Sequence, residues 1–247
     1  NTVTKSGSHI RDCVDLKRVM TVVIVALMPA LAFGIWNVGE QHSIAFGLDM
    51  TFIEKVWFGF LKVLPLIIVS YVVGLGIEFI SAQLRGHEVN EGFLVSGMLI
   101  PLIMPVDVPL WILALAVAFA VIIGKEVFGG TGMNIWNPAL IARAFLFFSY
   151  PSKMSGDDVW VAAAGKGEAL VDGFTGATPL AQATSGDLGY SFMDMFIGLI
   201  PGSVGETSTI AILLGAIILI WTGVASWKIM LSGVIGALAV GFLGNAF

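Results

Sequence analysis

The sequence predicts an all-helical protein that crosses a membrane several times and contains broken helices. Hydrophobic residues make up 57% of its 247 residues and charged residues only 12%, whereas an ordinary globular chain is about 25% charged. Several apolar runs approach or exceed the roughly 20 residues that a spanning helix needs. Prolines interrupt the longest run, and lipid tolerates irregular backbone only where protein or a water-filled cavity surrounds it.

Four apolar runs are predicted to span the membrane as continuous helices. Two of them, residues 19–37 and 56–80, lie in the first third of the chain. The other two, residues 208–224 and 226–246, lie at its end. Each run reaches the length of about 17 residues that the shortest spanning helices have.

The remaining apolar segments are predicted to be broken or short. Residues 92–124 contain three prolines and Asp107, so we expect two helical pieces joined at "MPVDVP". Residues 137–150 and 190–203 are short for spans, and each contains a proline. Paired short or interrupted hydrophobic segments are typical of transporter folds with inverted repeats, and we expect such repeats here.

The positive charges near the span ends predict the orientation, because Lys and Arg are enriched in cytoplasmic loops. The leader, residues 1–18, carries four of them and is therefore placed in the cytoplasm. Loop 151–190 then lies outside, and its acidic residues outnumber its two lysines. The chain divides into this cytoplasmic leader, a first group of helices (19–150), the outer loop, and a second, truncated group of helices (191–247).

Composition excludes several classes of function. The net charge of −5 and the lack of a basic run argue against a nucleic-acid partner. Cys13 is the only cysteine, so the chain forms no internal disulfide and is not expected to hold an iron–sulfur cluster alone. The three histidines lack metal-ligand spacing, and no nucleotide-binding fingerprint is present. We therefore predict no metal site and no catalytic side chain in this chain.

The outer loop contains a short motif, Asp-x-x-Thr-Gly-Ala-Thr, that runs from Asp172 to Thr178. It resembles the site at which a flavin transferase esterifies FMN, through its phosphate, to the final threonine hydroxyl. Thr178 would be the acceptor and Thr175 a motif position, while Gly176 and Ala177 would leave the backbone bare for the transferase. The same stretch also fits a plain glycine-rich connector, which composition alone favours.

Five segments of the chain resemble one protein family. In order, they are "SHIRDCVDLKRVM" (8–20), "RGHEVNEGFLVSGMLIPLIMP" (85–105), "GKEVFGGTGMNIWNPALIARAFLFFSYP" (124–151), "DGFTGATPLAQ" (172–182) and "IPGSVGETSTIAILLGA" (200–216). Together they resemble the B-type subunit of the sodium-translocating NADH:quinone oxidoreductase (Na⁺-NQR). The D-type subunit of the Rnf ferredoxin:NAD oxidoreductase forms a sister family that shares the flavin motif but lacks the "GHEVNEGF" segment.

The resemblance implies a membrane subunit of a respiratory complex in the bacterial cytoplasmic membrane. Such a complex passes electrons from NADH, through other subunits, to ubiquinone and moves Na⁺ outward. The resemblance also implies a urea-transporter-like helical bundle and a flavin transferase that attaches FMN. Because this family has further spans and the chain stops at "GFLGNAF", we expect C-terminal spans to be missing here.

The family also holds a noncovalent riboflavin, and the matching polar pair in "NIWNPA" is Asn134 and Asn137. Amide side chains suit the edge of a neutral flavin, which needs donors and acceptors but no counter-charge. The alternative is helix capping, because Asn137-Pro138 has the pattern of an N-cap followed by a proline at the first helical position. One residue is able to do both.

Two acidic residues are candidates for an ion pathway. Glu78 lies late in the second span, where a carboxylate in lipid is costly, and the family places an acid tied to Na⁺ uptake there. Asp107 is the second candidate, although a plain turn aspartate fits it better. The family has two adjacent glycines near the quinone, whereas this chain has Gly74-Leu75-Gly76. We therefore assign no residues to a quinone pocket. An alternative from another class of function is a passive channel in which the outer loop is only structural. Such a channel would bind no flavin.

Overall fold

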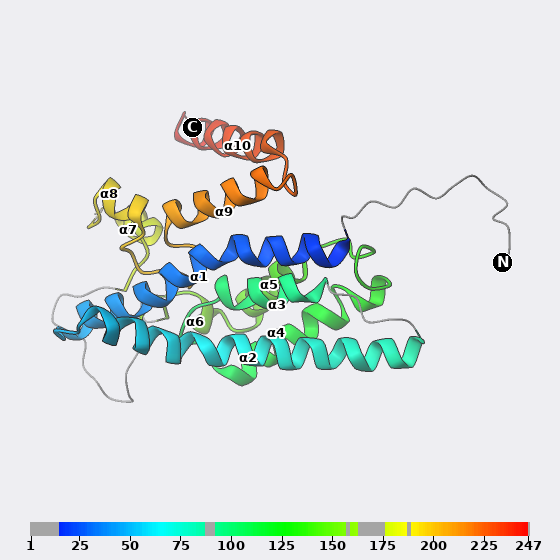
Figure 1. Ribbon diagram of the computed structural model, residues 1–247. Helices are drawn as coiled ribbons and strands as arrows, with labels where there is room; N and C mark the ends of the chain where they lie inside the picture. The colour runs from blue at the N-terminus through cyan, green and yellow to red at the C-terminus, as the bar shows by residue number, and fades with distance from the viewer. Residues whose placement is uncertain (1–14, 87–91, 157–158, 163–175, 187–188, 247) are drawn as a thin grey trace, which may run out of the picture.

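The computed structural model describes residues 15–86, 92–156, 159–162, 176–186 and 189–246, and every regular element in these ranges is helical (Figure 1). The helices, in chain order, are α1 (Leu16–Phe46), α2 (Phe52–Arg85), α3 (Phe93–Leu102), α4 (Leu110–Ile122), the 3-10 turn η1 (Glu126–Phe128), α5 (Pro138–Ser149), α6 (Pro151–Met154), α7 (Pro179–Ser185), α8 (Phe192–Ile197), α9 (Thr209–Trp221) and α10 (Trp227–Ala246). The predicted all-helical membrane fold is confirmed. The inverted repeats and the urea-transporter-like arrangement stay predictions.

Helices α1 and α2 form a long antiparallel pair. Gly47, with a left-handed φ of 61°, ends α1, and Thr51 begins α2 with a capping box that includes Glu54. The backbones approach closely, because a Cβ on Gly59 would lie only 1.8 Å from the Ile35 carbonyl oxygen. Lipid tails are as apolar as the helix surfaces, so close packing of small residues, rather than water exclusion, holds such helices together.

Helices α3 and α4 form a hairpin along α2. α3 runs antiparallel to α2, and the Ser70 hydroxyl of α2 donates to the Gly97 carbonyl of α3 at 2.8 Å. The chain turns at residues 103–109 and α4 returns, bringing Lys125 beside Glu78. The predicted break of residues 92–124 at the prolines is therefore confirmed.

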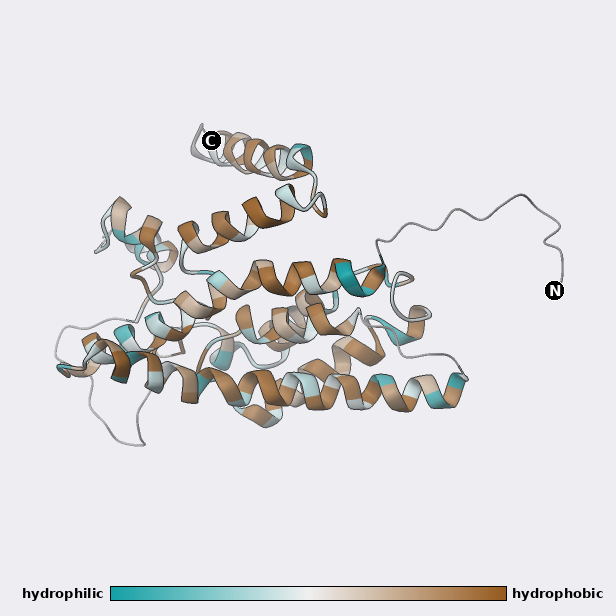
Figure 2. Cartoon of the chain, viewed as in Figure 1, coloured by the Kyte–Doolittle hydropathy of each residue, from teal (hydrophilic) through white to brown (hydrophobic). Residues whose placement is uncertain are grey.

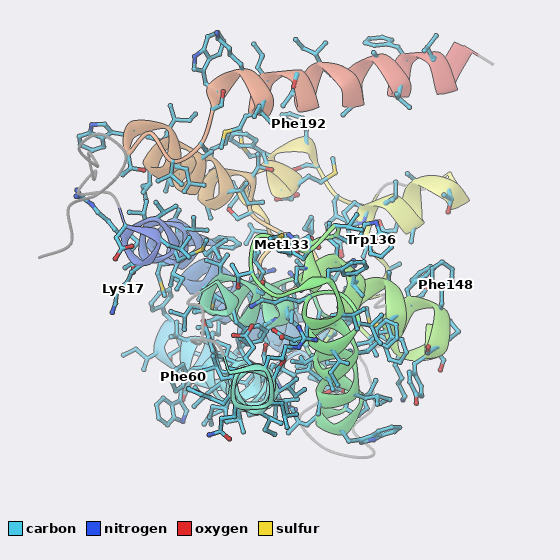
Figure 3. All side chains as sticks on the ribbon, turned by 90° about the vertical axis from the view of Figure 1, so that its right-hand side faces the viewer. Lys17, Phe60, Met133, Trp136, Phe148 and Phe192 are labelled. Atoms are coloured by element: carbon cyan, nitrogen blue, oxygen red, sulfur yellow. The ribbon has the colours of Figure 1, made fainter. Side chains whose placement is uncertain are left out.

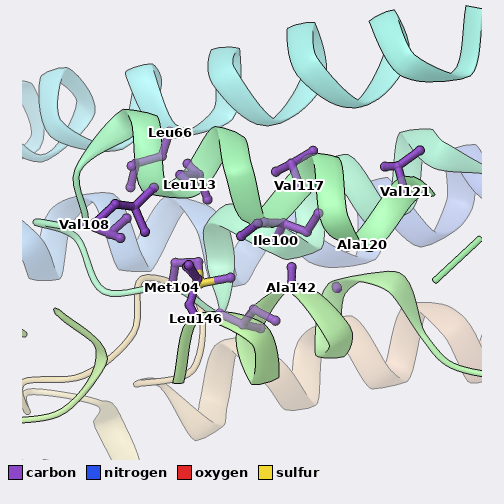
Figure 4. Packing of buried hydrophobic residues seen from close by; sticks show 14 of the residues in the cluster. Leu66, Ile100, Met104, Val108, Leu113, Val117, Ala120, Val121, Ala142 and Leu146 are labelled. Atoms are coloured by element: carbon purple, nitrogen blue, oxygen red, sulfur yellow. The ribbon is translucent and has the colours of Figure 1, made fainter. Parts of the chain in front are cut away.

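The main core lies between α2, α3, α4 and α5 (Figure 4). α4 supplies one side of it with Leu113 and Val117, which are fully buried. Ile100 of α3 and Leu146 of α5 pack against them. This core fixes the hairpin and α5 relative to α2.

Helix α9 crosses α1, and α10 follows on its outer side (Figure 1). Gly215 of α9 lies against α1, where a Cβ would come within 2.3 Å of the Ala26 carbonyl oxygen. α9 has 13 residues, about 20 Å of helix, so the prediction of a full-length span at residues 208–224 is wrong. The chain turns at Gly223 instead of extending the helix, with φ 74°.

Within the described ranges, four helical stretches are long and apolar enough to cross a membrane: Leu16–Phe46, Phe52–Arg85, Leu110–Phe128 and Trp227–Gly244. Hydrophobic residues predominate along these helices (Figure 2), and many of their large hydrophobic side chains are exposed. Phe60, Phe148 and Phe192 project outward from the bundle, as expected for side chains that meet lipid (Figure 3). The chain is a multi-pass membrane protein.

The bundle has two ends, which we name by the glycines that close the long helices. At the Gly47 end α1 turns into α2, and at the Gly86 end α2 stops. The loop 129–137 lies at the Gly86 end, whereas α7 and α8 lie toward the Gly47 end (Figure 1). Loop 129–137 and the segment with α7 therefore lie at opposite ends of the bundle, as the predicted topology requires. Two short helices, α6 and α7, fall within the segment that was predicted to be a loop.

Candidate functional site

Thr178, the predicted flavin acceptor, is the N-cap of α7. Its Oγ1 accepts a hydrogen bond from the Ala181 backbone N–H at 3.3 Å, and Pro179 occupies the first helical position. Gly176 and Ala177 are buried in the folded chain, and their role in presenting the motif to a transferase stays a prediction. Asp172 and Thr175 lie outside the described residues.

Gln182 of α7 ties the motif to the segment that precedes α8. Its Nε2 donates to the Ala177 carbonyl at 3.3 Å, and its Oε1 accepts from the Gly189 N–H at 3.0 Å. The neighbouring Tyr190 is partly buried, and this burial raises the pKa of its phenol. The C-terminal half of the motif is therefore folded onto the protein.

Thr178 opens onto a pocket of about 440 Å³. Residues 199–207, which we call the floor segment, line one side of it. Asn37 of α1 holds this segment by donating to the Ile200 carbonyl at 3.0 Å, and the Gly205 N–H donates to the Leu102 carbonyl of α3 at 2.7 Å. The other lining residues are Arg143, Trp160, Pro179, Leu180 and Met195.

The pocket contains one cation and one acid. Arg143 of α5 donates to the Glu206 carboxylate at 3.1 Å and to the Ile103 carbonyl. The Ser203 hydroxyl also donates to Glu206. The Arg143 side chain is 33% exposed, so its guanidinium is fixed in position yet still reaches the pocket.

Thr207 is the unsatisfied group of the pocket wall. The residue is 7% exposed, and its hydroxyl has no hydrogen-bond partner among the described residues. A buried polar group without a partner costs about 1–3 kcal/mol, so such a group is unusual unless a ligand satisfies it. A cation, a free hydroxyl and the half-buried Trp160 together suit a planar ligand with a negative group and a polar edge.

Asn134 and Asn137 do not line this pocket and lie in the loop 129–137 at the Gly86 end. Asn134 stabilises a turn, because its amide accepts from the Gly132 N–H at 3.3 Å and donates to the Trp136 carbonyl at 2.8 Å. Asn137 caps α5, with Oδ1 accepting from the Ala139 N–H at 2.9 Å. The capping interpretation is confirmed for Asn137, and riboflavin contact stays a prediction.

Glu78 is buried inside the protein, as its cost in lipid predicted, and it forms an ion pair with Lys125. The pairing with Lys125, 47 residues further along the chain, was not predicted from the sequence. Asp107 instead lies in the α3–α4 turn, with its side chain 47% exposed and one carboxylate oxygen 4.0 Å from Lys62 Nζ. Among the residues described by the structure, no three His, Cys, Asp or Glu side chains group as metal ligands.

Comparison with known proteins identifies the family of this chain. The family described as NQR2, RnfD, RnfE matches residues 3–247. The B-type subunit of the Na(+)-translocating NADH-quinone reductase of Chromohalobacter salexigens is 45% identical over 271 residues, covering 99% of this chain and 64% of that protein. Its counterpart in Ectopseudomonas mendocina is 43% identical over 273 residues, covering 99% of this chain and 66% of that protein.

The chain thus spans just under two thirds of the length of these relatives. The relatives carry the name of the B-type subunit, as the quoted segments predicted. With a match that extends over nearly its whole length, the chain belongs to the NQR2, RnfD, RnfE family.

Proposed function

We propose that this chain is the B-type membrane subunit of a Na⁺-translocating NADH:quinone oxidoreductase and carries covalent FMN on Thr178. The names of the relatives support the complex. The observation that carries the flavin assignment is the position of Thr178, on a pocket that also presents Arg143 and the Thr207 hydroxyl, which has no partner in the described part of the chain. Asp172 and Thr175 complete the motif that a flavin transferase would recognise.

The pocket residues fit FMN. A volume of about 440 Å³ lies within the usual range of roughly 300–1,000 Å³ for ligand pockets. Leu180, Met195 and Ile200 supply apolar surface for a flat ring. Arg143 supplies a positive charge for the phosphate diester, and the Thr207 hydroxyl supplies a hydrogen bond for a polar ring edge.

Each side chain then has a distinct task. Thr178 retains the flavin through its phosphate, which leaves the ring system free. FMN supplies electron transfer when bound, and the protein sets its position and its electrostatic surroundings. Arg143 favours negative charge in the pocket, because Ile103 and Glu206 hold its guanidinium in place.

A second flavin, noncovalent riboflavin, is proposed at the Gly86 end. Asn137 uses only its carbonyl oxygen as a cap, and its amide N–H₂ has no partner among the described residues. Thr131, in the same loop, has a buried hydroxyl that also lacks a described partner. These donors suit a neutral flavin edge, with Asn134 holding the loop in shape.

The remaining assignments follow from the same proposal. The protein lies in the cytoplasmic membrane of a bacterium, with its leader in the cytoplasm and Thr178 on the outer side of the membrane. Other subunits oxidise NADH, because this sequence has no nucleotide-binding fingerprint, and ubiquinone accepts the electrons. Na⁺ passes by Glu78, the buried carboxylate of α2.

Fluorescence of the protein on a denaturing gel tests this function. When the chain is co-expressed with an active flavin transferase, we expect a fluorescent band that disappears in Thr178→Val. Thr184→Val, in the same helix, is the matched control and should keep the band. A wild-type chain without the band would support a passive channel and refute the flavin assignment. Na⁺-stimulated NADH:quinone activity of membranes then distinguishes this pump from an Rnf-type complex.

A further inference from the structure

A buried ion pair joins α2 to the end of α4. The Lys125 ammonium donates to the Glu78 carboxylate, and the two side chains are 5% and 4% exposed. In the part of the chain that the structure describes, no other ion pair has both side chains so deeply buried. Lys125 Nζ also lies 5.8 Å from the centre of the Phe93 ring.

A second acid–base pair lies directly beside the first. Glu78, Ser81 and Arg85 occupy positions i, i+3 and i+7 of α2, so they share one face of the helix. The Ser81 hydroxyl donates to the Glu126 carboxylate at 2.5 Å. Arg85 donates to the Glu126 carbonyl at 2.6 Å and lies 3.8 Å from its carboxylate. Lys125 and Glu126 therefore each meet an opposite charge on the same face.

Stability alone does not explain these charges. A buried ion pair is often no more stabilising than apolar residues of the same size, because both charges lose their hydration. Ionisable residues inside a membrane bundle generally mark ion pathways. A lysine ammonium is a compact point charge with three donors, so it attracts oxygen ligands as a small monovalent cation does.

We propose that Lys125 is a tethered cation that occupies the Na⁺ site at Glu78, so that Na⁺ enters only in exchange for the ammonium group. The inference rests on the proposed Na⁺ transport. The displaced ammonium moves to the Glu126 carboxylate on the neighbouring residue, and Arg85, whose side chain is 43% exposed, turns to solvent. No buried carboxylate is unpaired at any stage, and the net charge of the cluster rises only by the bound Na⁺.

This exchange has a measurable consequence for affinity. A site that is occupied by an internal competitor binds Na⁺ more weakly, in proportion to the fraction of time that it is free. Removing the ammonium should therefore strengthen Na⁺ binding. It should also leave the buried Glu78 carboxylate without its partner, so that the stability of the protein depends on Na⁺.

The test is the thermal unfolding of the full-length protein in detergent, in NaCl and in choline chloride at equal ionic strength. In Lys125→Met we expect NaCl to raise the unfolding midpoint, with half-saturation at a Na⁺ concentration at least about tenfold below that of the wild type. The double variant Lys125→Met/Glu78→Gln should lose the difference between the salts. Lys55→Met, which breaks the Lys55–Glu40 pair of α1 and α2, should respond like the wild type.

Equal responses of Lys125→Met to the two salts would overturn the inference, as would a Na⁺ effect that survives in the double variant. If Lys125→Met does not accumulate, Lys125→Gln replaces it with the same expectation, because its amide can still donate to Glu78. The protein is produced without a flavin transferase for this measurement. A negative result therefore leaves the flavin gel untouched, and a missing gel band leaves this measurement valid.

Discussion

Arg143 of α5 and Glu206 of the floor segment form an ion pair of 3.1 Å across 63 residues of sequence. Their side chains are 33% and 51% exposed, so the pair itself contributes little to stability. The role of the pair is to position the Arg143 guanidinium. With the Ile103 carbonyl as a second acceptor, Glu206 holds a positive charge at the wall of the pocket that Thr178 lines.

Arg143→Gln should make the flavin on Thr178 harder to reduce, because the positive charge that favours the reduced, more negative flavin is lost. We expect its midpoint potential to fall by about 30 mV or more, which corresponds to roughly 1.4 kcal/mol for a two-electron couple. Redox titration of the purified protein measures this shift. Arg143→Lys keeps the charge and should remain near the wild-type potential, and an unchanged potential in Arg143→Gln would show that the Arg143 charge does not act on the flavin ring.

Gly59→Ala should destabilise the α1–α2 pair. The new methyl group would lie 1.8 Å from the Ile35 carbonyl oxygen, so the two backbones must separate. Overpacking of this kind costs about 1–3 kcal/mol, and the midpoint of thermal unfolding in detergent should fall accordingly. Gly76→Ala, in the same helix, is the control.

A Cβ on Gly76 meets nothing within 4 Å. Because alanine favours helix over glycine by up to about 1 kcal/mol, Gly76→Ala should be neutral or slightly stabilising. Similar losses in both variants would show that the cost lies in the helix backbone and not in the contact with Ile35.

Thr207→Val should stabilise the protein that lacks flavin. The substitution removes a buried hydroxyl that has no described partner and keeps nearly the same shape. The same variant should increase the native fluorescence and mobility of the attached flavin, since the ring loses a hydrogen bond. Fluorescence anisotropy of the flavin and thermal unfolding measure the two effects.

Ser208→Ala is the neighbouring control for Thr207. The Ser208 side chain caps α9 by accepting from the Ala211 N–H at 3.3 Å, so its loss should cost about 1 kcal/mol. It should leave the anisotropy of the flavin unchanged. If Thr207→Val also leaves the anisotropy unchanged, the Thr207 hydroxyl does not contact the flavin.

The breaks in this fold could be predicted from sequence because prolines and caps act locally. Pro105 and Pro109 lie in the turn at residues 103–109 that interrupts the apolar run, whereas Pro101 lies in the last turn of α3. Asn137-Pro138 predicted the start of α5 in the same way. Such signals depend only on a few neighbouring residues.

The outer loop carries the same kind of local signal. Thr178-Pro179 is also an N-cap followed by a proline, and Gly186 ends the helix with φ 85°. α7 has only seven residues, too few for a periodic pattern to support it. Composition therefore predicted an exposed loop at the motif, although its Gly-Ala pair is buried.

The pairings that build the pocket and the ion pair could not be predicted. Arg143 and Glu206 are 63 residues apart, and Lys125 and Glu78 are 47 apart. Each pair depends on how several helices pack, and no pattern along the chain encodes that packing. Only the cost of a carboxylate in lipid indicated that Glu78 must have a partner.

Thr178 has two roles that one substitution can separate. Thr178→Val removes both the hydroxyl that accepts the flavin and the cap of α7, which is worth about 1 kcal/mol. Thr178→Asn removes the flavin acceptor but keeps a side-chain oxygen that caps helices well. We expect both variants to lose the fluorescent band, and only Thr178→Val to increase hydrogen exchange in α7.

Thr178→Ser completes the set, because serine both caps the helix and offers a hydroxyl for esterification. It should keep normal exchange in α7 and at least part of the band. The buried Gly176 and Ala177 add one more expectation: the transferase must act before α7 docks or must open it. To test this, Thr178→Ser protein is folded first and then treated with transferase and flavin donor. It should be modified more slowly than the same protein co-expressed with the enzyme. Equal rates would mean that the folded cap is itself the substrate.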